Sequence, residues 1–487
     1  MGVIRNQSIK NFFSYYSAII IGAVNTIFVY PNVFNDNPEN YGLIQIIISY
    51  SVILSVFSQF GINSSFVRFF PDVKDKGQLL FFSVLVSLTG FLLIFGTYLL
   101  FEDQIIQYLS PSELLLDNFY YIFILTALII TSQLLTAISS SYLRVATPTF
   151  LDEVFMKVSS LFLLILLWFG VISFDLFLQL FFATYLVKAL ILFAVQLIHD
   201  RLHFTFNLKD FEFRKVLIFC SYVFFGVGAS LVASKIDIMM IGYILDLQDV
   251  AFYTIAFFIG NVIIVPARGI RSISYPILAN AFKENNHELI KDIYKKSSIN
   301  QFLFGALLFL CIWLNIDDLF NLLPEKFAGG KYVVLFIAIT RLFSLLTGVN
   351  GLILINSRFY KYDIIFKLPF LVIVVITNYL LIPIYNIEGA ALATAVSFFC
   401  LYTCEILFVY NKMRIQPFSK KTIYVLLIIL FYIFLIPFVD LTANSFINIL
   451  IRSVLIIPSF IFLSLKMNIS EDISVMIKDL NKRFSKS

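Results

Sequence analysis

About fourteen apolar stretches between Ser8 and Met467 limit what this chain can fold into more than any other feature. Each stretch approaches the roughly 20 residues that an α-helix needs to cross the hydrocarbon core of a bilayer. Hydrophobic residues make up 60% of the 487 residues and charged residues only 13%. This composition excludes a soluble globular domain. The sequence therefore predicts an all-α integral membrane protein with about 14 transmembrane helices.

The predicted spans form two groups along the chain. The first group covers residues 11–31, 43–66, 79–101, 119–142, 154–173 and 176–198. The second group covers residues 216–245, 250–279, 297–323, 331–356, 364–382, 387–410, 421–439 and 446–466.

Lysine and arginine residues fall in alternate gaps between these spans. Of the 35 Lys and Arg residues, 27 lie in alternate gaps and in the two terminal segments, whereas Lys326 and Lys331 lie on the opposite side. Cytoplasmic loops of membrane proteins collect basic residues, so this bias predicts the orientation. We expect both termini in the cytoplasm and a multi-pass location in the inner (plasma) membrane. The remaining six basic residues lie inside the spans: Lys188, Lys235, Arg268, Arg271, Arg341 and Arg452.

The short loops exclude several classes of enzyme. No gap can hold a nucleotide-binding domain, and no G-x-x-x-x-G-K-[ST] motif occurs. A membrane glycosyltransferase or polymerase would need carboxylates in a large outer loop, and Asp317–Asp318 is better explained as a solvated helix end. The three histidines lie in predicted cytoplasmic loops without nearby cysteines or carboxylate clusters, so we expect no metal site and no cofactor. The net charge of +5 suits loops that face anionic membrane lipids, and it requires no nucleic-acid partner.

The first six spans and the next six have similar features at equivalent positions. Gly42 and Ala251 each begin the second helix of a group, and Pro71 and Pro276 each lie near its end, at offsets of roughly 205 to 209 residues. Copies of six spans enter the membrane in the same orientation, which predicts a parallel repeat about the membrane normal. We expect an N-terminal lobe over residues 1–205, a C-terminal lobe over 206–412, and two further helices with a cytoplasmic tail over 413–487.

Three segments resemble motifs of a known transporter family. Lys235–Gly242 (KIDIMMIG) is similar to its S-x-D-x-x-x-[IL]-G stretch, and Asp249–Tyr253 (DVAFY) to the A-V-G-x-Y turn that follows. Pro383–Thr394 (PIYNIEGAALAT) is close to P-x-Y-G-I-x-G-A-A-x-A-T, with Asn386 in place of a glycine. Asn tolerates left-handed backbone geometry, so this departure is mild. The whole chain thus resembles a polysaccharide (O-antigen or capsule-type) flippase of the multidrug/oligosaccharidyl-lipid/polysaccharide exporter superfamily.

Ionisable groups inside a membrane span are candidates for functional residues. Arg341 and Lys188 lie roughly 15 Å and 18 Å into their spans at about 1.5 Å per residue. Each is predicted either to bind substrate or to pair with a carboxylate. Arg268 and Arg271 share a helix face, where they form either a phosphate clamp or a basic helix end that follows the positive-inside rule.

Four other charged residues complete the candidates. Lys235 is a further substrate-binding candidate. Asp237 and Glu405 are candidates for ion coupling, with a structural salt bridge or an interfacial position as the alternative. Arg452 is interpreted as structural.

The resemblance implies that the chain moves a lipid-diphosphate-linked oligosaccharide from the cytoplasmic to the outer leaflet by alternating access. Such a flippase would serve surface polysaccharide biosynthesis, including O-antigen of lipopolysaccharide, and would be a monomer driven by an ion gradient or the membrane potential. A polysaccharide polymerase is a candidate partner. The six intramembrane cations favour an anionic cargo. The alternatives are a multidrug or small-cation antiporter of the same superfamily and, less favoured, a membrane glycosyltransferase or polymerase.

Overall fold

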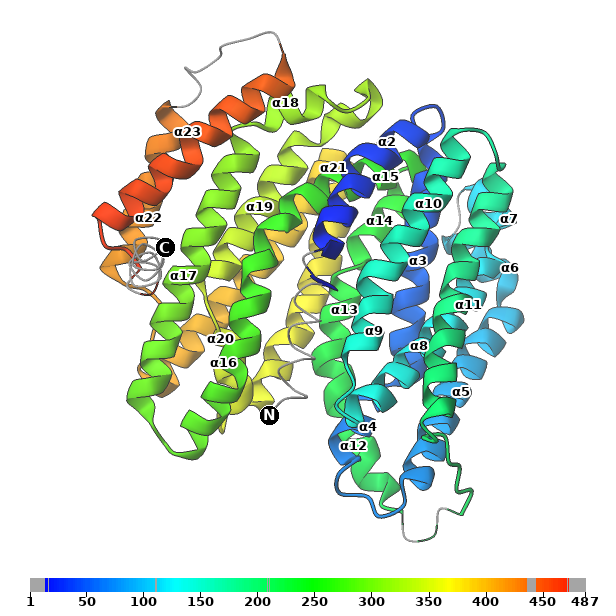
Figure 1. Ribbon diagram of the computed structural model, residues 1–487. Helices are drawn as coiled ribbons and strands as arrows, with labels where there is room; N and C mark the ends of the chain where they lie inside the picture. The colour runs from blue at the N-terminus through cyan, green and yellow to red at the C-terminus, as the bar shows by residue number, and fades with distance from the viewer. Residues whose placement is uncertain are drawn as a thin grey trace, which may run out of the picture. The chain divides into compact units, whose positions relative to one another are not determined.

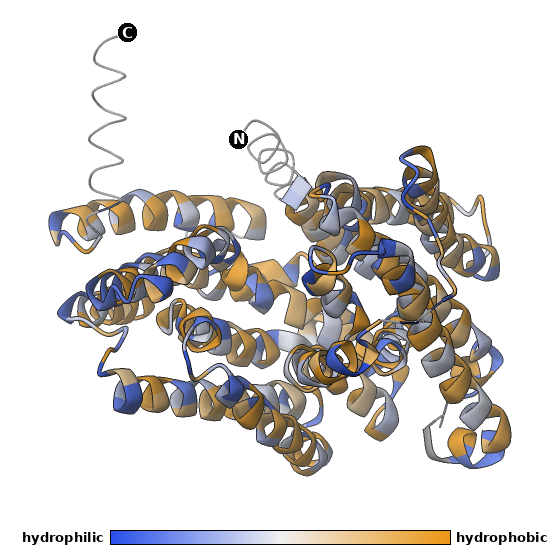
Figure 2. Ribbon diagram, turned by 90° about the horizontal axis from the view of Figure 1, so that it is seen from below, coloured by the Kyte–Doolittle hydropathy of each residue, from blue (hydrophilic) through white to orange (hydrophobic). Residues whose placement is uncertain are grey.

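The computed structural model describes residues 14–15, 17–109, 112–207, 209, 211–435, 444–470 and 472. Every regular element in this part of the chain is a helix. Ten of the described helices are long and apolar enough to cross a membrane, and Ser17–Val33 is a shorter apolar helix. Figure 2 shows apolar residues along most of the length of the helices. The predicted all-α membrane class is therefore confirmed.

The helices pack into two compact units, Met1–Thr254 and Ile255–Ser487, whose helices are labelled in Figure 1. The elements of the first unit are η1 (Val24–Val29), α2 (Tyr30–Val33), α3 (Pro38–Gln59), α4 (Ile62–Phe69), α5 (Lys76–Leu100), α6 (Glu102–Leu109), α7 (Glu113–Asp117), α8 (Tyr120–Ser141), α9 (Ala146–Phe150), η2 (Leu151–Phe155), α10 (Met156–Trp168), α11 (Phe174–Ile198), α12 (Phe213–Val223), η3 (Phe224–Gly228), α13 (Ala229–Ala233), α14 (Ile236–Ile244) and the start of α15 (Leu247–Asn261).

Helix α3 is central to the first unit and packs along α5 and α8, while α8 also packs along α11. Small residues permit these close approaches between membrane helices. A Cβ atom on Gly90 of α5 would lie 2.1 Å from the backbone oxygen of Ser58 in α3, so no larger residue fits at this crossing. The helix starts are fixed locally: the side chains of Asp75 and Ser173 accept hydrogen bonds from the backbone N–H groups of Gly77 and Leu176.

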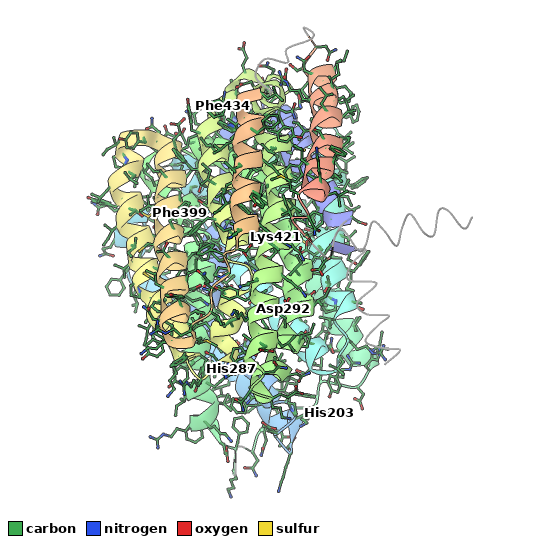
Figure 3. All side chains as sticks on the ribbon, turned by 90° about the vertical axis from the view of Figure 1, so that its left-hand side faces the viewer. His203, His287, Asp292, Phe399, Lys421 and Phe434 are labelled. Carbon is green, nitrogen blue, oxygen red and sulfur yellow. The ribbon has the colours of Figure 1, made fainter. Side chains whose placement is uncertain are left out.

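The second unit continues with η4 (Val262–Ile264), α16 (Val265–Lys283), α17 (His287–Trp313), α18 (Ile316–Asn321), η5 (Glu325–Gly330), α19 (Lys331–Leu346), α20 (Asn350–Asn356), α21 (Lys361–Met413), α22 (Lys420–Leu435) and α23 (Ser445–Lys466). Helix α17 packs against α16, α19, α22 and α23, and buried apolar residues of α17 and its neighbours, Phe302, Leu310, Leu345, Val425 and Ile456 among them, form its core. His287, at the start of α17, and Phe434, at the end of α22, lie at opposite ends of this unit (Figure 3).

Each of the fourteen predicted spans overlaps described helices, but one predicted loop is wrong. The gap between the predicted spans 119–142 and 154–173 is helical from Ala146, and this helix continues through the π-helical turn η2 into α10. Its charges are paired: Lys157 lies 3.0 Å from Glu153, and Asp152 pairs with Lys188 of α11. Because these charges are paired, they can lie within a helix, although the charged residues of this segment suggested a loop in water.

Other predicted spans are interrupted or joined. The predicted span 216–245 breaks between α13 and α14, and the predicted span 331–356 breaks between α19 and α20. The predicted spans 364–382 and 387–410 instead form one helix, α21, that is kinked at Asn386 with φ of 51° and ψ of −134°. The positive φ agrees with a position that is a glycine in the family's motif, but the ψ lies outside the left-handed helical region that asparagine was expected to adopt.

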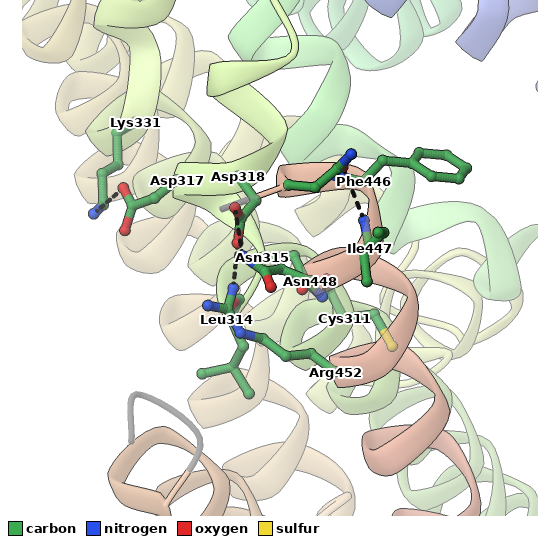
Figure 4. A network of polar contacts seen from close by, with 11 residues as sticks. Cys311, Leu314, Asn315, Asp317, Asp318, Lys331, Phe446, Ile447, Asn448 and Arg452 are labelled. Atoms are coloured by element: carbon green, nitrogen blue, oxygen red, sulfur yellow. Dashed lines mark hydrogen bonds and ion pairs between the residues drawn. The ribbon is translucent and has the colours of Figure 1, made fainter. Parts of the chain in front are cut away.

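Asp318 is not the solvated residue that the sequence suggested. Its carboxylate lies 2.6 Å from the guanidinium of Arg452 on α23, and both side chains are buried (Figure 4). Only the neighbouring Asp317 is exposed, where it pairs with Lys331. The structural interpretation of Arg452 agrees with this contact.

The two units describe packing and do not test the predicted repeat. Their boundary lies after Thr254, later than the predicted lobe boundary near residue 205, because α12 packs on α4 and α14 packs on α3. The lobes over 1–205 and 206–412 stay a prediction.

Candidate functional site

A cavity of about 600 Å³ opens inside the first unit. Five segments that are far apart in the sequence contribute to its wall: residues 56–67, 132–140, 152, 188 and 223–231. Much of this wall is apolar and comes from residues such as Val56, Val223 and Leu231. Seven lining residues carry amide or hydroxyl groups, so a largely apolar wall also presents a set of hydrogen-bonding groups.

Three amide side chains form a cluster on one wall of the cavity. Asn63 Nδ2 donates to Gln59 Oε1 at 2.6 Å and to Gln133 Oε1 at 3.4 Å. Gln59 in turn donates from Nε2 to the backbone oxygen of Ile130 at 3.0 Å, which fixes its amide plane. Asn63 Oδ1 is buried and has no partner among the described residues. The cluster can therefore offer a hydrogen-bond acceptor to a ligand.

Hydroxyl groups line the cavity from α8. Ser132, Thr136 and Ser140 follow one another at intervals of four residues and so form a stripe along one helix face. The hydroxyl of Ser132 is buried without a partner among the described residues. This stripe was missed in the sequence, although its spacing was visible there.

One ion pair, between Lys188 of α11 and Asp152 of η2, also lines the cavity. Lys188 Nζ lies 2.6 Å from Asp152 Oδ1, with 11% of the lysine side chain and 44% of the aspartate side chain exposed. The sequence left open whether Lys188 binds substrate or pairs with a carboxylate, and in the structure it pairs with Asp152. Asp152 was missed because it had been placed in a loop.

Arg341 of α19 lies in the second unit, apart from any carboxylate among the described residues. Its guanidinium carbon lies 5.7 Å from the ring centre of Phe257 and 5.4 Å from that of Phe398. Its Nε is buried and has no hydrogen-bond partner in the described part of the chain. Contacts with two aromatic rings stabilise the charge and leave the hydrogen-bonding groups of the arginine available.

The other predicted substrate-binding residues do not meet at one point within either unit. Arg268 and Arg271 are exposed on α16, and Lys235 is half-buried at the start of α14 in the first unit. For the residues that the structure describes, none of these three takes part in an ion pair. Their roles stay predictions.

The two candidate ion-coupling carboxylates are both buried. Asp237 of α14 accepts a hydrogen bond of 2.8 Å from the hydroxyl of Tyr253. Glu405 of α21 accepts one of 3.2 Å from the side-chain amide of Asn350. Each carboxylate is thus held by a neutral donor. Within the described ranges, no group of three His, Cys, Asp or Glu residues could hold a metal ion.

Membrane-length helices around a cavity with hydrogen-bonding groups can bind a ligand, since ligand sites in helix bundles lie between the helices. A family model described as polysaccharide biosynthesis protein matches residues 8–282, more than half of the chain. The chain therefore belongs to the polysaccharide biosynthesis protein family. The MatE family model matches residues 223–385. A search of curated proteins found no match.

Solved transporter structures share the fold. The lipid II flippase MurJ in its inward closed conformation has a TM-score of 0.74 and 15% identity, over 97% of this chain and 99% of that chain. An inward-facing multidrug resistance MATE family transporter has a TM-score of 0.59 and 14% identity, over 80% of this chain and 94% of that chain. The Vibrio cholerae MATE transporter VcmN in the bent form has a TM-score of 0.53 and 13% identity, over 85% of this chain and 98% of that chain.

These comparisons confirm the predicted superfamily. The chain is a multi-pass flippase or exporter of the multidrug/oligosaccharidyl-lipid/polysaccharide exporter superfamily. Its family and its structural neighbours are transporters and flippases rather than enzymes.

Proposed function

We propose that this protein moves a lipid-diphosphate-linked oligosaccharide from the cytoplasmic to the outer leaflet by alternating access. The polysaccharide biosynthesis family supports a role in building a surface polysaccharide. The observation that carries the proposal is the cavity of the first unit, whose largely apolar wall also presents amides, hydroxyls and the ion pair of Lys188 with Asp152. The lipid tail stays in the bilayer while the head group passes through the protein.

Amide and hydroxyl side chains match the chemistry of an oligosaccharide. Each sugar hydroxyl both donates and accepts hydrogen bonds, and amide and hydroxyl side chains do the same. Asn63 Oδ1 and the Ser132 hydroxyl are lining groups without a partner among the described residues. The volume of about 600 Å³ lies within the range of small-molecule sites, roughly 300–1,000 Å³. A flexible glycan can therefore pass through such a cavity by exchanging hydrogen bonds with these side chains, without needing a charged binding site.

The intramembrane cations support an anionic head group. Lys188 and Arg452 are paired with carboxylates, which leaves Arg341, Arg268, Arg271 and Lys235 outside ion pairs among the described residues. Arg341 is the best placed for a diphosphate, because its fork of donors suits phosphate oxygens and its charge lies over two aromatic rings. Asp237 and Glu405 remain the candidates for coupling to an ion gradient.

The second candidate is a multidrug or organic-cation antiporter, which the MatE match over residues 223–385 favours. A cation exporter needs carboxylates that are free to meet its cargo, whereas the cavity carboxylate of Asp152 is engaged with Lys188. We therefore rank it second. The flippase is proposed to be a monomer in the plasma membrane with cytoplasmic termini, and a polysaccharide polymerase would use its product.

A reconstituted flipping assay tests the cargo. The purified protein in liposomes is given a fluorescent lipid-diphosphate oligosaccharide, and the crossing of its sugars is followed with a membrane-impermeant sugar oxidant. Asn63→Leu and Gln133→Leu should slow flipping by about 2- to 12-fold each, because a neutral hydrogen bond contributes about 0.5–1.5 kcal/mol. Asn32→Leu is the matched control, because Asn32 is exposed and bonds only within its own helix turn.

A parallel assay with a fluorescent organic cation distinguishes the two candidates. Transport of the cation without any flipping of the glycolipid would contradict the proposed cargo and favour the antiporter. Equal flipping rates in the cavity variants and in Asn32→Leu would remove the cavity from the substrate path.

A further inference from the structure

Polar groups of the second unit gather at the break between α19 and α20. Helix α19 ends at Leu346 and α20 begins at Asn350. Between them Gly348 has φ of 59°, and a Cβ there would lie 2.8 Å from the backbone nitrogen of Ser298, so only glycine fits. A helix break at membrane depth is tolerated where protein groups satisfy the freed backbone. Ser298 does so here, since its hydroxyl donates to the Leu346 carbonyl at 2.6 Å.

A buried chain of hydrogen bonds starts at this break and ends at a carboxylate. The hydroxyl of Tyr294 on α17 donates to Asn350 Oδ1 at 2.6 Å, and Asn350 Nδ2 donates to Glu405 Oε2 at 3.2 Å. Tyr294, Asn350 and Glu405 are at most 5% exposed. The chain therefore joins α17, the first residue of α20, and α21 through the side chain of Asn350.

The charged groups around Glu405 do not neutralise it through direct contact. On α21, Asp363 and Lys367 lie near Glu405, but they pair with each other at 2.7 Å. From α16, Arg271 interacts with Glu405 only through space and is itself exposed. The remaining titratable neighbours are Tyr294 on α17 and Cys404, the preceding residue. The carboxylate thus has a neutral amide as its hydrogen-bond donor.

An apolar cluster lies next to this chain. Val349 precedes Asn350, Ile290 lies one turn before Tyr294 on α17, and Val409 lies one turn after Glu405 on α21. These residues limit access of water to the carboxylate from that side. The hydrogen bond from Asn350 therefore matters more to the ionised carboxylate than it would at an exposed site.

We propose that Glu405 takes up and releases one proton, and that its protonation state controls the position of α20 at the helix break. The proton comes from the aqueous phase and adds to a carboxylate oxygen, so that one negative charge is lost and no other covalent bond changes. An ionised carboxylate accepts a stronger hydrogen bond than a neutral acid. Protonation therefore loosens the contact that holds Asn350, and α20 gains freedom relative to α21. This inference does not depend on which cargo is carried.

Spin labelling of the full-length protein tests the proposal. In a background in which the four native cysteines are replaced, Gly351→Cys on α20 carries a nitroxide label, because a Cβ there meets no atom within 4 Å. Gly329→Cys is the matched control: it is exposed and equally unobstructed, and it lies outside the network. Label mobility is measured by electron paramagnetic resonance between about pH 5 and pH 9. This range covers the pKa values documented for buried glutamates in other proteins.

The label at Gly351→Cys should become more mobile as the pH falls, with a one-proton transition, while the label at Gly329→Cys should not change. Glu405→Gln should abolish the transition and give the low-pH spectrum throughout, whereas Glu388→Gln on the same helix should preserve it. Asn350→Leu serves as a second variant and should also give the low-pH spectrum throughout, because the contact that protonation loosens is already removed. A flat response at Gly351→Cys, or a transition that survives either Glu405→Gln or Asn350→Leu, would overturn the proposal.

Discussion

At the scale of single residues, Arg341 shows how a charge can lie in a membrane span without a carboxylate partner among the residues that the structure describes. Its guanidinium contacts the rings of Phe257 and Phe398, both within the second unit. Cation–π contacts contribute about 0.5–2 kcal/mol each, and they stabilise the charge without using its N–H donors. Such an arginine remains able to bind an anion, whereas the paired Lys188 must first exchange its partner Asp152.

Substitution of Arg341 should therefore affect transport more than folding. Arg341→Ala should weaken head-group binding by about 10- to 150-fold, because a hydrogen bond to a charged group contributes about 1.5–3 kcal/mol. Arg341→Lys should restore only part of the activity, since it keeps the charge but loses the fork of donors. Flipping rates in liposomes provide the measurement, and Arg358→Ala is the control, because Arg358 also lies over a phenylalanine ring but is exposed. Normal flipping by Arg341→Ala would exclude Arg341 from the site.

At the scale of elements, a buried ion pair attaches the C-terminal helix α23 to the rest of the second unit. Helix α23 packs on α17 and α18. Arg452 of α23 lies 2.6 Å from Asp318 of α18 and also donates to the Leu314 carbonyl at 3.2 Å (Figure 4). Asn448, one turn earlier on α23, donates to the same aspartate at 3.4 Å. Two polar side chains of α23 thus meet at the carboxylate of Asp318.

The adjacent aspartates 317 and 318 allow a matched test of this attachment. Asp318→Asn should lower the free energy of unfolding by about 3–5 kcal/mol, because it leaves the buried charge of Arg452 uncompensated. Asp317→Asn should change it by less than about 1 kcal/mol, since the pair of Asp317 with Lys331 is exposed. Thermal unfolding of the two purified variants in the same detergent gives the comparison. Equal stability of the two would show that the ion pair does not hold α23.

At the scale of the whole molecule, orientation in the membrane follows from the distribution of lysine and arginine. The basic residues fall in alternate loops, and basic loops are retained on the cytoplasmic side. Ten described helices are long and apolar enough to cross a membrane, and one of them, α21, covers two predicted spans with the kink at Asn386 between them. The sidedness itself stays a prediction.

Cysteine labelling tests this orientation. In a background without native cysteines, Asp36→Cys and Asn386→Cys should react with a membrane-impermeant thiol reagent added to intact cells. Lys74→Cys, Lys209→Cys and Lys291→Cys should react only after permeabilisation. Reaction of Lys74→Cys from outside would reverse the proposed orientation.

The sequence by itself determined the membrane class, the approximate spans and the superfamily, because hydropathy and short motifs are local properties of the chain. It also indicated the positive φ at Asn386, a position that is a glycine in the family's motif. Gln59, Asn63 and Gln133 could be named as polar residues in spans, but their meeting in one cavity could not.

Only the tertiary structure decided which charges are paired and where the cavity lies. Lys188 and Asp152 are 36 residues apart, and Arg452 and Asp318 are 134 residues apart. Only helix packing brings such partners together, and a local sequence pattern does not predict these contacts. A buried charge is stabilised either by a charged partner or by aromatic rings, so the fold decides whether a membrane arginine or lysine is a structural group or one available to a substrate.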